Sequence, residues 1–299
     1  MIRKFALPII ALAIPAAAHA QAFGAASSYN VFVSGNFTSS GSDTEGKVAV
    51  GGNVNVSSYS IGANLTGGTQ NALVAGGSVN YNSGSVKGNI VSKNAPTLTS
   101  FGYQNGGHSV TGAGAVSSAI NFSQTASYLQ QASTQWGNLA GNGSIVAQYG
   151  GITFTGTSNT LNVFNISASQ LQAGSYYNFN IPSGSTVLFN VSGTSVNFNN
   201  TGYNFSNQTK VLWNLKDATT VGVTSLNGSI LAPKAAVNGN YGAINGQLFA
   251  KSFSGYTQIN SQYFTGNLPT VNAVPEPASM AVLGLGALGF LRRRRAAKK

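Results

Sequence analysis

The 299-residue sequence contains no cysteine, so no disulfide can stabilise the fold. Charged side chains make up only 6% of the residues, and only two histidines are present. Few groups are therefore available for acid–base chemistry or metal binding. Stability must come from backbone hydrogen bonds and from the packing of apolar side chains, which form 42% of the chain.

An uninterrupted apolar run of the about 20 residues that a membrane-spanning helix needs is also absent. A shorter run, residues 5–14, follows two basic residues near the N-terminus. It precedes Ala18-x-Ala20, the small-x-small pattern of a cleaved signal peptide. We expect signal peptidase to remove residues 1–20, with Ala18 and Ala20 at the cleavage site, so that the mature chain begins at Gln21.

The C-terminal end follows a short linker, residues 271–274, and combines three elements in a fixed order. These are the motif Pro275-Glu276-Pro277, an apolar stretch over 278–291 that predicts a transmembrane helix, and a basic end over 292–299. Because arginine is costly to move across a bilayer, the basic end should stop the chain in the membrane. The stop cluster consists of Arg292, Arg293, Arg294 and Arg295.

This tail closely resembles the PEP-CTERM sorting signal, which also has these three elements in this order. The resemblance implies transient anchoring in the inner membrane and removal of the tail by an exosortase-type membrane protease. It further implies localisation on the outer surface or in an extracellular matrix. A plain tail anchor without processing is the alternative, but it gives the Pro-Glu-Pro motif no role.

The net charge of +11 is concentrated in the two ends of the chain. Residues 21–274 contain seven lysines, no arginine and three acidic residues, Asp43, Glu45 and Asp217, which gives a net charge of +4. Nucleic-acid binding requires basic residues clustered on one face, and these lysines are scattered. Nucleic acid is therefore not an expected partner.

The region between the ends is rich in glycine, serine, threonine and asparagine but also carries 16 phenylalanines and 12 tyrosines. Disordered chains lack such residues, so we expect one folded, all-β ectodomain over residues 21–270. A repeat supports a specific architecture. Residues 48–56 align with residues 73–81, apolar on apolar and Gly-Gly on Gly-Gly, and Asn64-Leu65 aligns with residues 89–90.

The repeat also has distant copies. Residues 79–80 match residues 237–238, and residues 226–230 recur as residues 244–248. Short strands at such periods predict a β-solenoid, in which inward Val, Ile and Leu side chains stack from coil to coil. Asparagine and glycine are expected to take left-handed conformations at the corners. A β-sandwich also has short, regularly spaced strands and is the alternative.

One segment, residues 122–139, has apolar residues at helical rather than strand spacing. Asn121 followed by Gln124 resembles a capping box, and Gly141 can end the helix. We expect this single α-helix to lie along the flank of the solenoid and to cover an apolar face.

Coil repeats, a mid-chain helix and closing coils together resemble the choice-of-anchor A domain of bacterial surface proteins. The motifs that carry the resemblance lie at residues 43–52, 227–233 and 244–247. The resemblance implies an adhesive role and brings no catalytic residues. The closing coils also look like the solenoid of ice-binding proteins, a likeness of fold that does not fix function.

Catalytic and metal-binding residues are scarce. His108 is the only histidine outside the signal peptide, and Asp43 and Glu45 are the only carboxylates close in sequence. Two carboxylates are the minimum for glycoside hydrolysis, but both fall in a Gly/Ser-rich approach to the first coil. They are candidates for a weak calcium site if backbone carbonyls complete it. We expect no cofactor and no enzymatic activity.

An uncharged surface of amides and hydroxyls suits contact with neutral carbohydrate, on which tyrosine rings can stack. We therefore expect a structural or adhesive surface protein associated with exopolysaccharide or biofilm. Ice binding and carbohydrate-active catalysis are the alternatives, and the threonines at Thr97, Thr99, Thr153 and Thr155 form no visible ladder. The candidate sugar contacts are Tyr59, Tyr81, Tyr103, Tyr176, Tyr177 and Tyr203.

Overall fold

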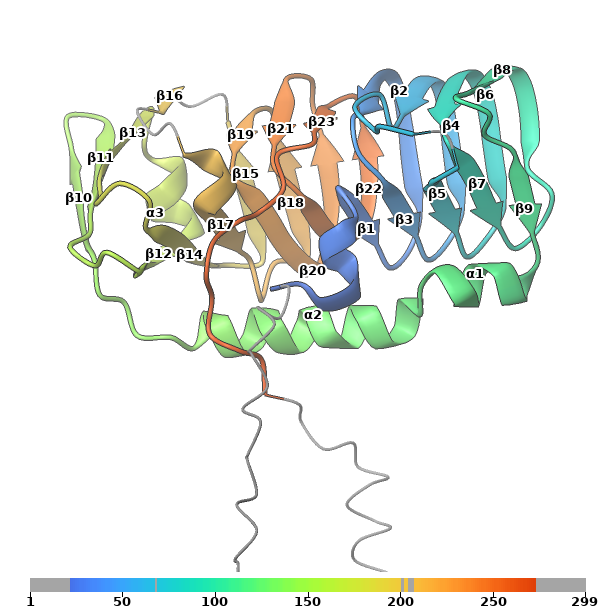
Figure 1. Cartoon of the computed structure of the whole chain (residues 1–299). Coiled ribbons are helices and arrows are strands. Elements are labelled where there is room, and N and C mark those ends of the chain that lie inside the picture. Colours follow the sequence, from blue (N-terminus) through green and yellow to red (C-terminus); the bar gives the residue numbers. More distant parts are fainter. Residues whose placement is uncertain (1–21, 68, 200–201, 204–206, 273–299) are drawn as a thin grey trace, which may run out of the picture.

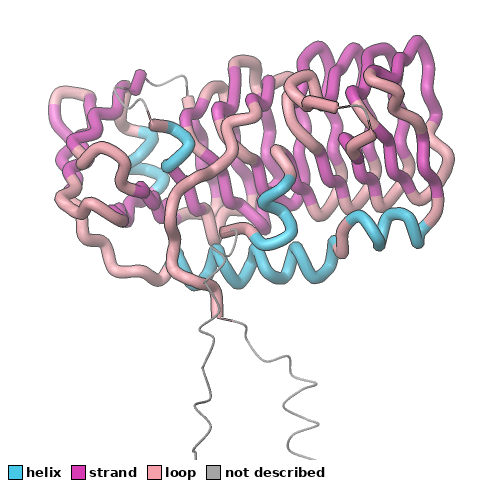
Figure 2. Tube along the Cα trace, viewed as in Figure 1, coloured by secondary structure: helices cyan, strands magenta, loops and turns pink. Residues whose placement is uncertain are grey.

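The computed structural model describes residues 22–67, 69–199, 202–203 and 207–272 (Figure 1). Strands wind into coils that stack along one axis, and a long helix runs beside the stack (Figure 2). The pairing between successive coils is parallel, which excludes the β-sandwich alternative and confirms the β-solenoid. The helices are α1 (Ala113–Ala119), α2 (Phe122–Gly137), α3 (Ala168–Gln172), η1 (Gly24–Ser28) and η2 (Gln208–Lys210).

Each coil has up to three sides, and one side, the helix face, lies against the long helix. The strands of the helix face are β1 (Val31–Val33), β3 (Val48–Val50), β5 (Asn71–Ala75), β7 (Asn89–Ser92), β9 (Ser109–Thr111), β12 (Leu161–Ser167), β14 (Thr186–Ser192) and β17 (Val211–Asn214). Two longer strands begin on the helix face and continue past a corner. These are β20 (Ser229–Gly239) and β22 (Leu248–Gly255).

The other two sides are formed largely by strands that bend at a corner. The bent strands are β2 (Phe37–Thr44), β4 (Val54–Ile61), β6 (Val79–Lys87) and β8 (Thr97–Gln104). Shorter strands continue these sides in the C-terminal half: β15 (Ser195–Phe198), β18 (Thr220–Val223), β19 (Leu226–Asn227), β21 (Ala243–Asn245) and β23 (Gln258–Asn260).

The sequence repeat is the stacking register of the coils. Val48 pairs with Leu73, and Val54 pairs with Val79, as the 25-residue shift predicts. The repeat of residues 226–230 in 244–248 is confirmed as well, because Leu226 pairs with Ile244. The proposed continuation from Asn64-Leu65 to residues 89–90 is wrong, since Asn89 stacks on Asn71 instead. Residues 64–65 lie outside any strand, in the connection to β5.

The coils do not follow one another in simple sequence order. The N-terminal half winds outward from β1 to β9, after which α1 and α2 carry the chain back along the stack (Figure 1). The C-terminal half then winds from β12 to β22, and β22 pairs with β1. The first and last coils of the domain are therefore neighbours in the middle of the stack.

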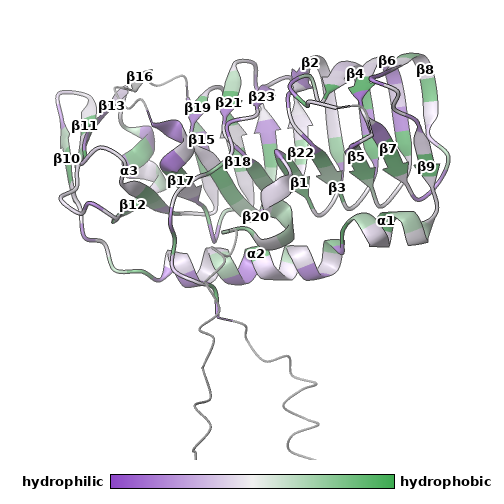
Figure 3. Ribbon diagram, viewed as in Figure 1, coloured by the Kyte–Doolittle hydropathy of each residue, from purple (hydrophilic) through white to green (hydrophobic). Residues whose placement is uncertain are grey.

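The helix face is buried on both sides, which explains its continuous apolar strands. Val31 and Val33 point into the solenoid, whereas Phe32 between them belongs to the cluster beneath α2. The same alternation places Ala49 against the helix. Figure 3 shows this hydrophobic band over β3, β5 and β7, directly above the helices. Burial on two sides removes the polar alternation of an ordinary surface strand.

The long helix matches the expected position and differs at its end. Asn121 caps its N-terminus by accepting a 3.0 Å hydrogen bond from the Gln124 backbone N–H. The helix ends at Gly137, slightly before the expected end at residue 139. Its buried side includes Leu129 and Trp136. The short helices α1 and α3 were not predicted, because each has too few residues for a periodic pattern to be seen.

The corners depart from expectation in residue type. Stacked corners carry Gly41, Ser58, Ser83 and Ser100, all with φ between 47° and 67°. Serine therefore takes the left-handed conformation that we assigned to asparagine and glycine, because each corner is held by the coil beside it. At a second corner Gly52 is required by close approach. A Cβ there would lie 2.3 Å from Oδ1 of Asn36, which accepts a hydrogen bond from the Asn53 backbone N–H.

A small second sheet closes one end of the stack. It contains β10 (Ser144–Gln148), β11 (Gly151–Thr155), β13 (Tyr176–Asn180) and β16 (Gly202–Tyr203), with β10 and β11 forming an antiparallel hairpin. Aromatic rings fill the interior below this sheet. Phe189 stacks on Trp213 with ring centroids 4.1 Å apart, and Phe154 contacts Phe164 at 5.4 Å.

Candidate functional site

One side of the solenoid is formed by the first halves of β2, β4, β6 and β8, by β15 and β18, and by the second halves of β20 and β22. It carries a continuous row of uncharged residues. The row takes one outward-pointing position from each coil, and seven of its eight residues are exposed, with Gly222 intermediate. We call this side the polar face. Eight rungs about 4.8 Å apart make the row roughly 34 Å long. In stacking order the row consists of Asn197, Gly222, Asn238, Ser254, Thr38, Asn55, Asn80 and Thr97.

Hydrogen bonds between neighbouring rungs hold side chains of this row in place. The Nδ2 of Asn80 donates to Oδ1 of Asn55 at 3.3 Å, and the Oγ of Ser254 donates to Oδ1 of Asn238 at 2.7 Å. Side chains that are already ordered lose less conformational entropy when a ligand binds. These two pairs of amide and hydroxyl groups are therefore preorganised on the polar face.

A groove of about 360 Å³ lies on the polar face between Thr38, Ser57 and Ser254. Tyr256 forms one wall of the groove, is 52% exposed, and stacks on Tyr241 with ring centroids 5.7 Å apart and an interplanar angle of 18°. Tyr241 is 68% exposed. Exposed, stacked aromatic rings beside hydroxyl and amide groups form a surface with both stacking and hydrogen-bonding capacity.

The tyrosines singled out from the sequence lie mostly elsewhere. Tyr59, Tyr81 and Tyr177 are buried inside the coils, and burial raises the pKa of the Tyr59 and Tyr81 phenols. Tyr103 is half-buried at the end of the stack, and Tyr176 is 41% exposed on the second sheet. The side chain of Tyr203 lies outside the described part of the molecule.

Sequence reasoning missed Tyr241 and Tyr256, although a signal was present. Gly242 follows Tyr241 and Gly255 precedes Tyr256, so both tyrosines occupy glycine-flanked corners rather than strand interiors. Side chains at such corners project away from the stacked core.

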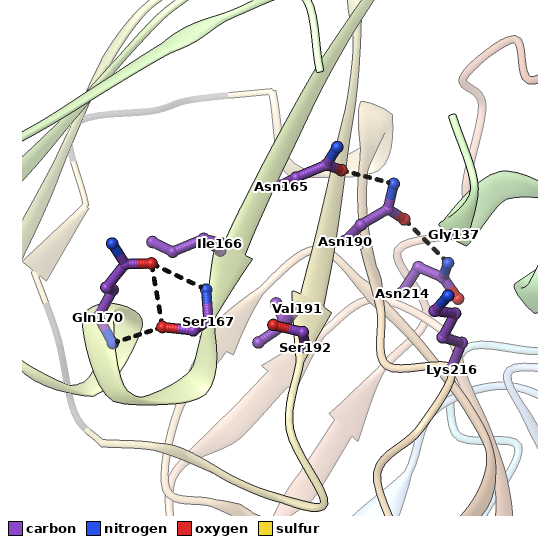
Figure 4. Close-up of a pocket in the computed structure, with 10 residues that line it drawn as sticks. All are labelled: Gly137, Asn165, Ile166, Ser167, Gln170, Asn190, Val191, Ser192, Asn214 and Lys216. Carbon is purple, nitrogen blue, oxygen red and sulfur yellow. Dashed lines mark hydrogen bonds between the residues drawn. The ribbon is translucent and has the colours of Figure 1, made fainter. Parts of the chain in front are cut away.

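A second groove, of about 370 Å³, lies at the end of α2 (Figure 4). A ladder of amides forms its upper part: Asn214 donates to Oδ1 of Asn190 at 2.9 Å, and Asn190 donates to Oδ1 of Asn165 at 3.0 Å. Asn190 also donates to the Trp136 carbonyl in the last turn of α2 at 3.0 Å. The hydrogen-bonding groups of these amides are used on one another and on the last turn of α2. The groove is therefore a structural junction between the helix and the solenoid.

The carboxylates lie on the third side of the solenoid, which is formed by the second halves of the bent strands and by β19, β21 and β23. Asp43 accepts a 3.5 Å hydrogen bond from Gln258, and Glu45 accepts bonds from the backbone N–H and hydroxyl of Ser261 at 2.8 and 3.2 Å. Burial, reinforced by the charge of Glu45, raises the pKa of Asp43, while the bond from Gln258 lowers it. The described residues contain no cluster of three or more metal-ligating side chains, and weak calcium binding at this pair stays a prediction.

His108 is exposed at the end of the stack, and its backbone N–H donates to Oδ1 of Asn89 at 3.2 Å. The cleavage residues Ala18 and Ala20, the Pro-Glu-Pro motif, the apolar stretch and the arginine cluster all lie outside the described residues. Within the described ranges, no helix is long and apolar enough to cross a membrane.

The two ends of the described chain lie together against α2. The hydroxyl of Tyr128 donates to the Ala22 carbonyl at 3.2 Å. Gln135 and Asn272 exchange two hydrogen bonds, of 2.7 and 2.9 Å. The segment that carries the sorting tail therefore leaves the domain from its helix side.

Comparisons with known proteins assign both parts of the chain. The PEP-CTERM protein-sorting motif matches residues 273–295, which shows a protein that is exported and sorted by exosortase to the cell surface or the extracellular space. Among curated proteins, no significant match was found.

Three solved structures of ice-binding proteins are similar. One from the Antarctic ascomycete Antarctomyces psychrotrophicus is 14% identical, covers 84% of this chain and 98% of its own, and has a TM-score of 0.35. One from an Antarctic biological consortium is 10% identical, covers 80% of this chain and 88% of its own, and has a TM-score of 0.35. The DUF3494 domain of Shewanella frigidimarina ice-binding protein_1 is 13% identical, covers 80% of this chain and 94% of its own, and has a TM-score of 0.33. At these values the likeness assigns no function.

The family model described as "Putative Ice-binding-like adhesive domain" matches residues 22–261. The match spans the solenoid, α2 and both halves of the polar face. The choice-of-anchor A family is not shown by these comparisons. The chain therefore belongs to the ice-binding-like adhesive domain family and carries a PEP-CTERM sorting signal at its C-terminal end.

Proposed function

We propose that this protein is an extracellular adhesive protein that binds neutral exopolysaccharide through its polar face. The observation that carries the proposal is the uncharged row of eight rungs beside the stacked pair Tyr241–Tyr256. Amides and hydroxyls can both donate to and accept from sugar hydroxyls, and tyrosine rings pack on the apolar faces of sugar rings. The absence of charge on the row favours a neutral rather than an acidic polymer.

Several finer assignments accompany this proposal. Signal peptidase removes residues 1–20, residues 21–270 form the ectodomain, and residues 271–299 form the linker and sorting tail. Exosortase recognises Pro275-Glu276-Pro277, and the motifs at residues 43–52 and 227–233 support kinship with choice-of-anchor A domains. The polymer belongs to the matrix that the producing cell secretes.

We also propose that the protein is not an enzyme. The two neighbouring carboxylates, Asp43 and Glu45, are engaged by Gln258 and Ser261. Glycoside hydrolysis needs one carboxyl group free to donate a proton and another facing the scissile bond.

The binding proposal is tested by retention of the purified protein on the exopolysaccharide of the producing strain, with an unrelated anionic polymer for comparison. Tyr241→Ala with Tyr256→Ala should weaken retention about tenfold, since two stacking contacts are lost. The matched control is Tyr149→Ala. Tyr149 is 89% exposed and, like Tyr241, has a positive φ, but it lies in the β10–β11 turn on the second sheet. Equal losses in both variants would contradict the proposed site.

Ice binding is the second candidate function, favoured by the family description and by the regular spacing of the row. Only Thr38 and Thr97 are threonines among the eight rungs, so the row lacks a repeated threonine. An ice-growth assay of the same variants separates the two functions. Ice-growth inhibition without polysaccharide retention would replace the first proposal by the second.

Processing of the tail is tested separately. Replacing Pro275, Glu276 and Pro277 by alanine should leave the sorting tail attached in the producing strain. The intact mass of the exported protein reports this directly. A normal mature mass in the variant would contradict the role of the motif.

A further inference from the structure

One end of the solenoid is open. Among the described residues, β8 (Thr97–Gln104) pairs only with β6, and β9 (Ser109–Thr111) pairs only with β7. Figure 1 shows these two strands at the end of the stack that is remote from the second sheet. The outward edge of β8 therefore presents backbone N–H and C=O groups with no strand beside them.

At the opposite end, the outer edge of β12, the terminal strand of the helix face, is covered. The backbone N–H groups of Asn142 and Gly143 donate to the Val163 carbonyl on the edge strand β12, at 3.1 and 3.3 Å. The Asn142 side chain completes this cover, because Oδ1 accepts from the Val163 N–H at 2.7 Å and Nδ2 donates to the Leu161 carbonyl at 2.9 Å. The terminal strand of the helix face is thus covered at this end, whereas its counterpart at the open end, β9, pairs only with β7 among the described residues.

The usual defences against edge pairing are missing from β8. Its eight residues, TLTSFGYQ, include no charged residue and no proline. The left-handed corner at Ser100 does not deflect the edge, since it stacks on the equivalent corner at Ser83. Natural edge strands normally carry lysine, proline or an irregular bulge that prevents pairing.

The side chains at this end are incompletely packed. Leu98, Phe101 and Tyr103 are half-buried and lie against the solenoid core on one side only. Phe101 contacts both Tyr81 and Tyr103, with ring centroids 4.8 Å apart in each case. One more coil would cover these rings as each coil covers the one beneath it.

The bent outline of the open edge favours a second copy of this chain as the partner. The edge turns at Ser100 from the polar face onto the third side and continues on the helix face through β9. A single extended peptide could therefore pair with only one of these sides. The open end of a second copy has the same outline and the same lack of charge. A two-fold axis perpendicular to the stack would bring the two edges together in antiparallel orientation.

We propose that two copies of this chain associate end to end through the open edge formed by β8 and β9. The polar rows of the two copies then lie on one elongated particle, which doubles the number of rungs available to a polymer. Two linked binding surfaces hold a repetitive ligand more tightly than either alone. The association requires no ligand and is independent of what the polar face binds.

The test is sedimentation of the full mature protein over a range of about 1 μM to 1 mM. The wild-type mass should rise from one to two chains and no further. Thr99→Lys with Gln104→Lys places two like charges on each exposed edge and should raise the dissociation constant at least about tenfold. The matched control is Thr134→Lys with Gln130→Lys, on exposed positions of α2.

The control should dimerise like the wild type, and equal melting temperatures should show that all three proteins are folded. A wild-type protein that stays monomeric over the whole range would overturn the proposal. Dimers that persist unchanged in the edge variant would also overturn it, because another surface would then be responsible. Growth into open-ended filaments would overturn the two-fold arrangement.

Discussion

Val31 of β1 and Leu248 of β22 are register partners in adjacent parallel strands, although they lie near opposite ends of the folded domain's sequence. Their pairing joins the outward-winding and inward-winding halves of the solenoid. Neither half therefore ends in an exposed edge at the centre of the stack. The same junction continues the polar row, because Thr38 of the first half pairs with Ser254 of the second.

Leu248→Ala should be strongly destabilising because Leu248 is fully buried at this junction. The expected loss in the free energy of unfolding is about 2–5 kcal/mol, from lost burial and the cavity left behind. Lys251→Ala, at an exposed position of the same strand, should change it by less than about 0.5 kcal/mol. Urea unfolding of both variants provides the measurement, and similar losses would show that the junction is not tightly packed.

Gly84→Ala should be destabilising for a backbone reason. Gly84 has φ = +128°, and a Cβ there would lie 1.9 Å from the Tyr59 carbonyl oxygen of the neighbouring coil. The strain and the forced separation of the coils should cost about 2 kcal/mol or more. Gly102→Ala is the control, since a Cβ at Gly102 meets no atom within 4 Å. The Gly84 variant should have a clearly lower melting temperature than the Gly102 variant. Equal melting temperatures would contradict this account.

Asn190→Ala should loosen the C-terminal turn of α2. The substitution removes the donor to the Trp136 carbonyl and the acceptor for the buried Asn214 amide. Leaving such groups unpaired should cost about 1–3 kcal/mol. Hydrogen exchange of the last turn of α2 should accelerate in this variant. Asn165→Ala, at the exposed end of the ladder, should have a smaller effect, and the reverse order would refute the proposed role of the ladder.

The coil architecture could be predicted because stacking makes the register visible in the sequence. Each coil repeats the pattern of the coil beneath it, so Val54 and Val79 occupy equivalent places in both the repeat and the structure. The order of the coils could not be predicted. A repeat shows that two segments are equivalent, but it does not show that β22 stacks on β1 rather than at the far end.

The candidate site was harder to predict than the fold. Residues 79–80 and 237–238 were recognised as copies, and Asn80 and Asn238 do lie in one row of the polar face. The exposure of individual tyrosines depends on whether each points inward or sits at a corner. Tyr59 and Tyr81 point inward from β4 and β6 and are buried, whereas Tyr256 follows the end of β22 at a corner and is exposed.

Asp43→Asn should change how stability depends on pH. Burial, the charge of Glu45 and the weaker opposing effect of Gln258 together raise the pKa of Asp43 in the folded state. Ionised Asp43 therefore destabilises the fold above its folded pKa, and this penalty disappears once the pH falls below the unfolded value of about 3.9. Asparagine has nearly the same shape, keeps an acceptor for Gln258 and carries no charge. The variant should melt at a higher temperature than the wild type at pH 7, and the difference should shrink as the pH approaches about 3.5.

Thermal melts between these two pH values, at constant ionic strength, provide the measurement for Asp43→Asn. Asp217→Asn removes one negative charge at an exposed position and so controls for the change in net charge. If the difference in melting temperature between the Asp43 variant and the wild type stays constant with pH, it is caused by packing rather than by ionisation of Asp43. A difference that grows in acid would mean that Asp43 is stabilised as the carboxylate, which is the arrangement a cation bound at Asp43 and Glu45 would produce.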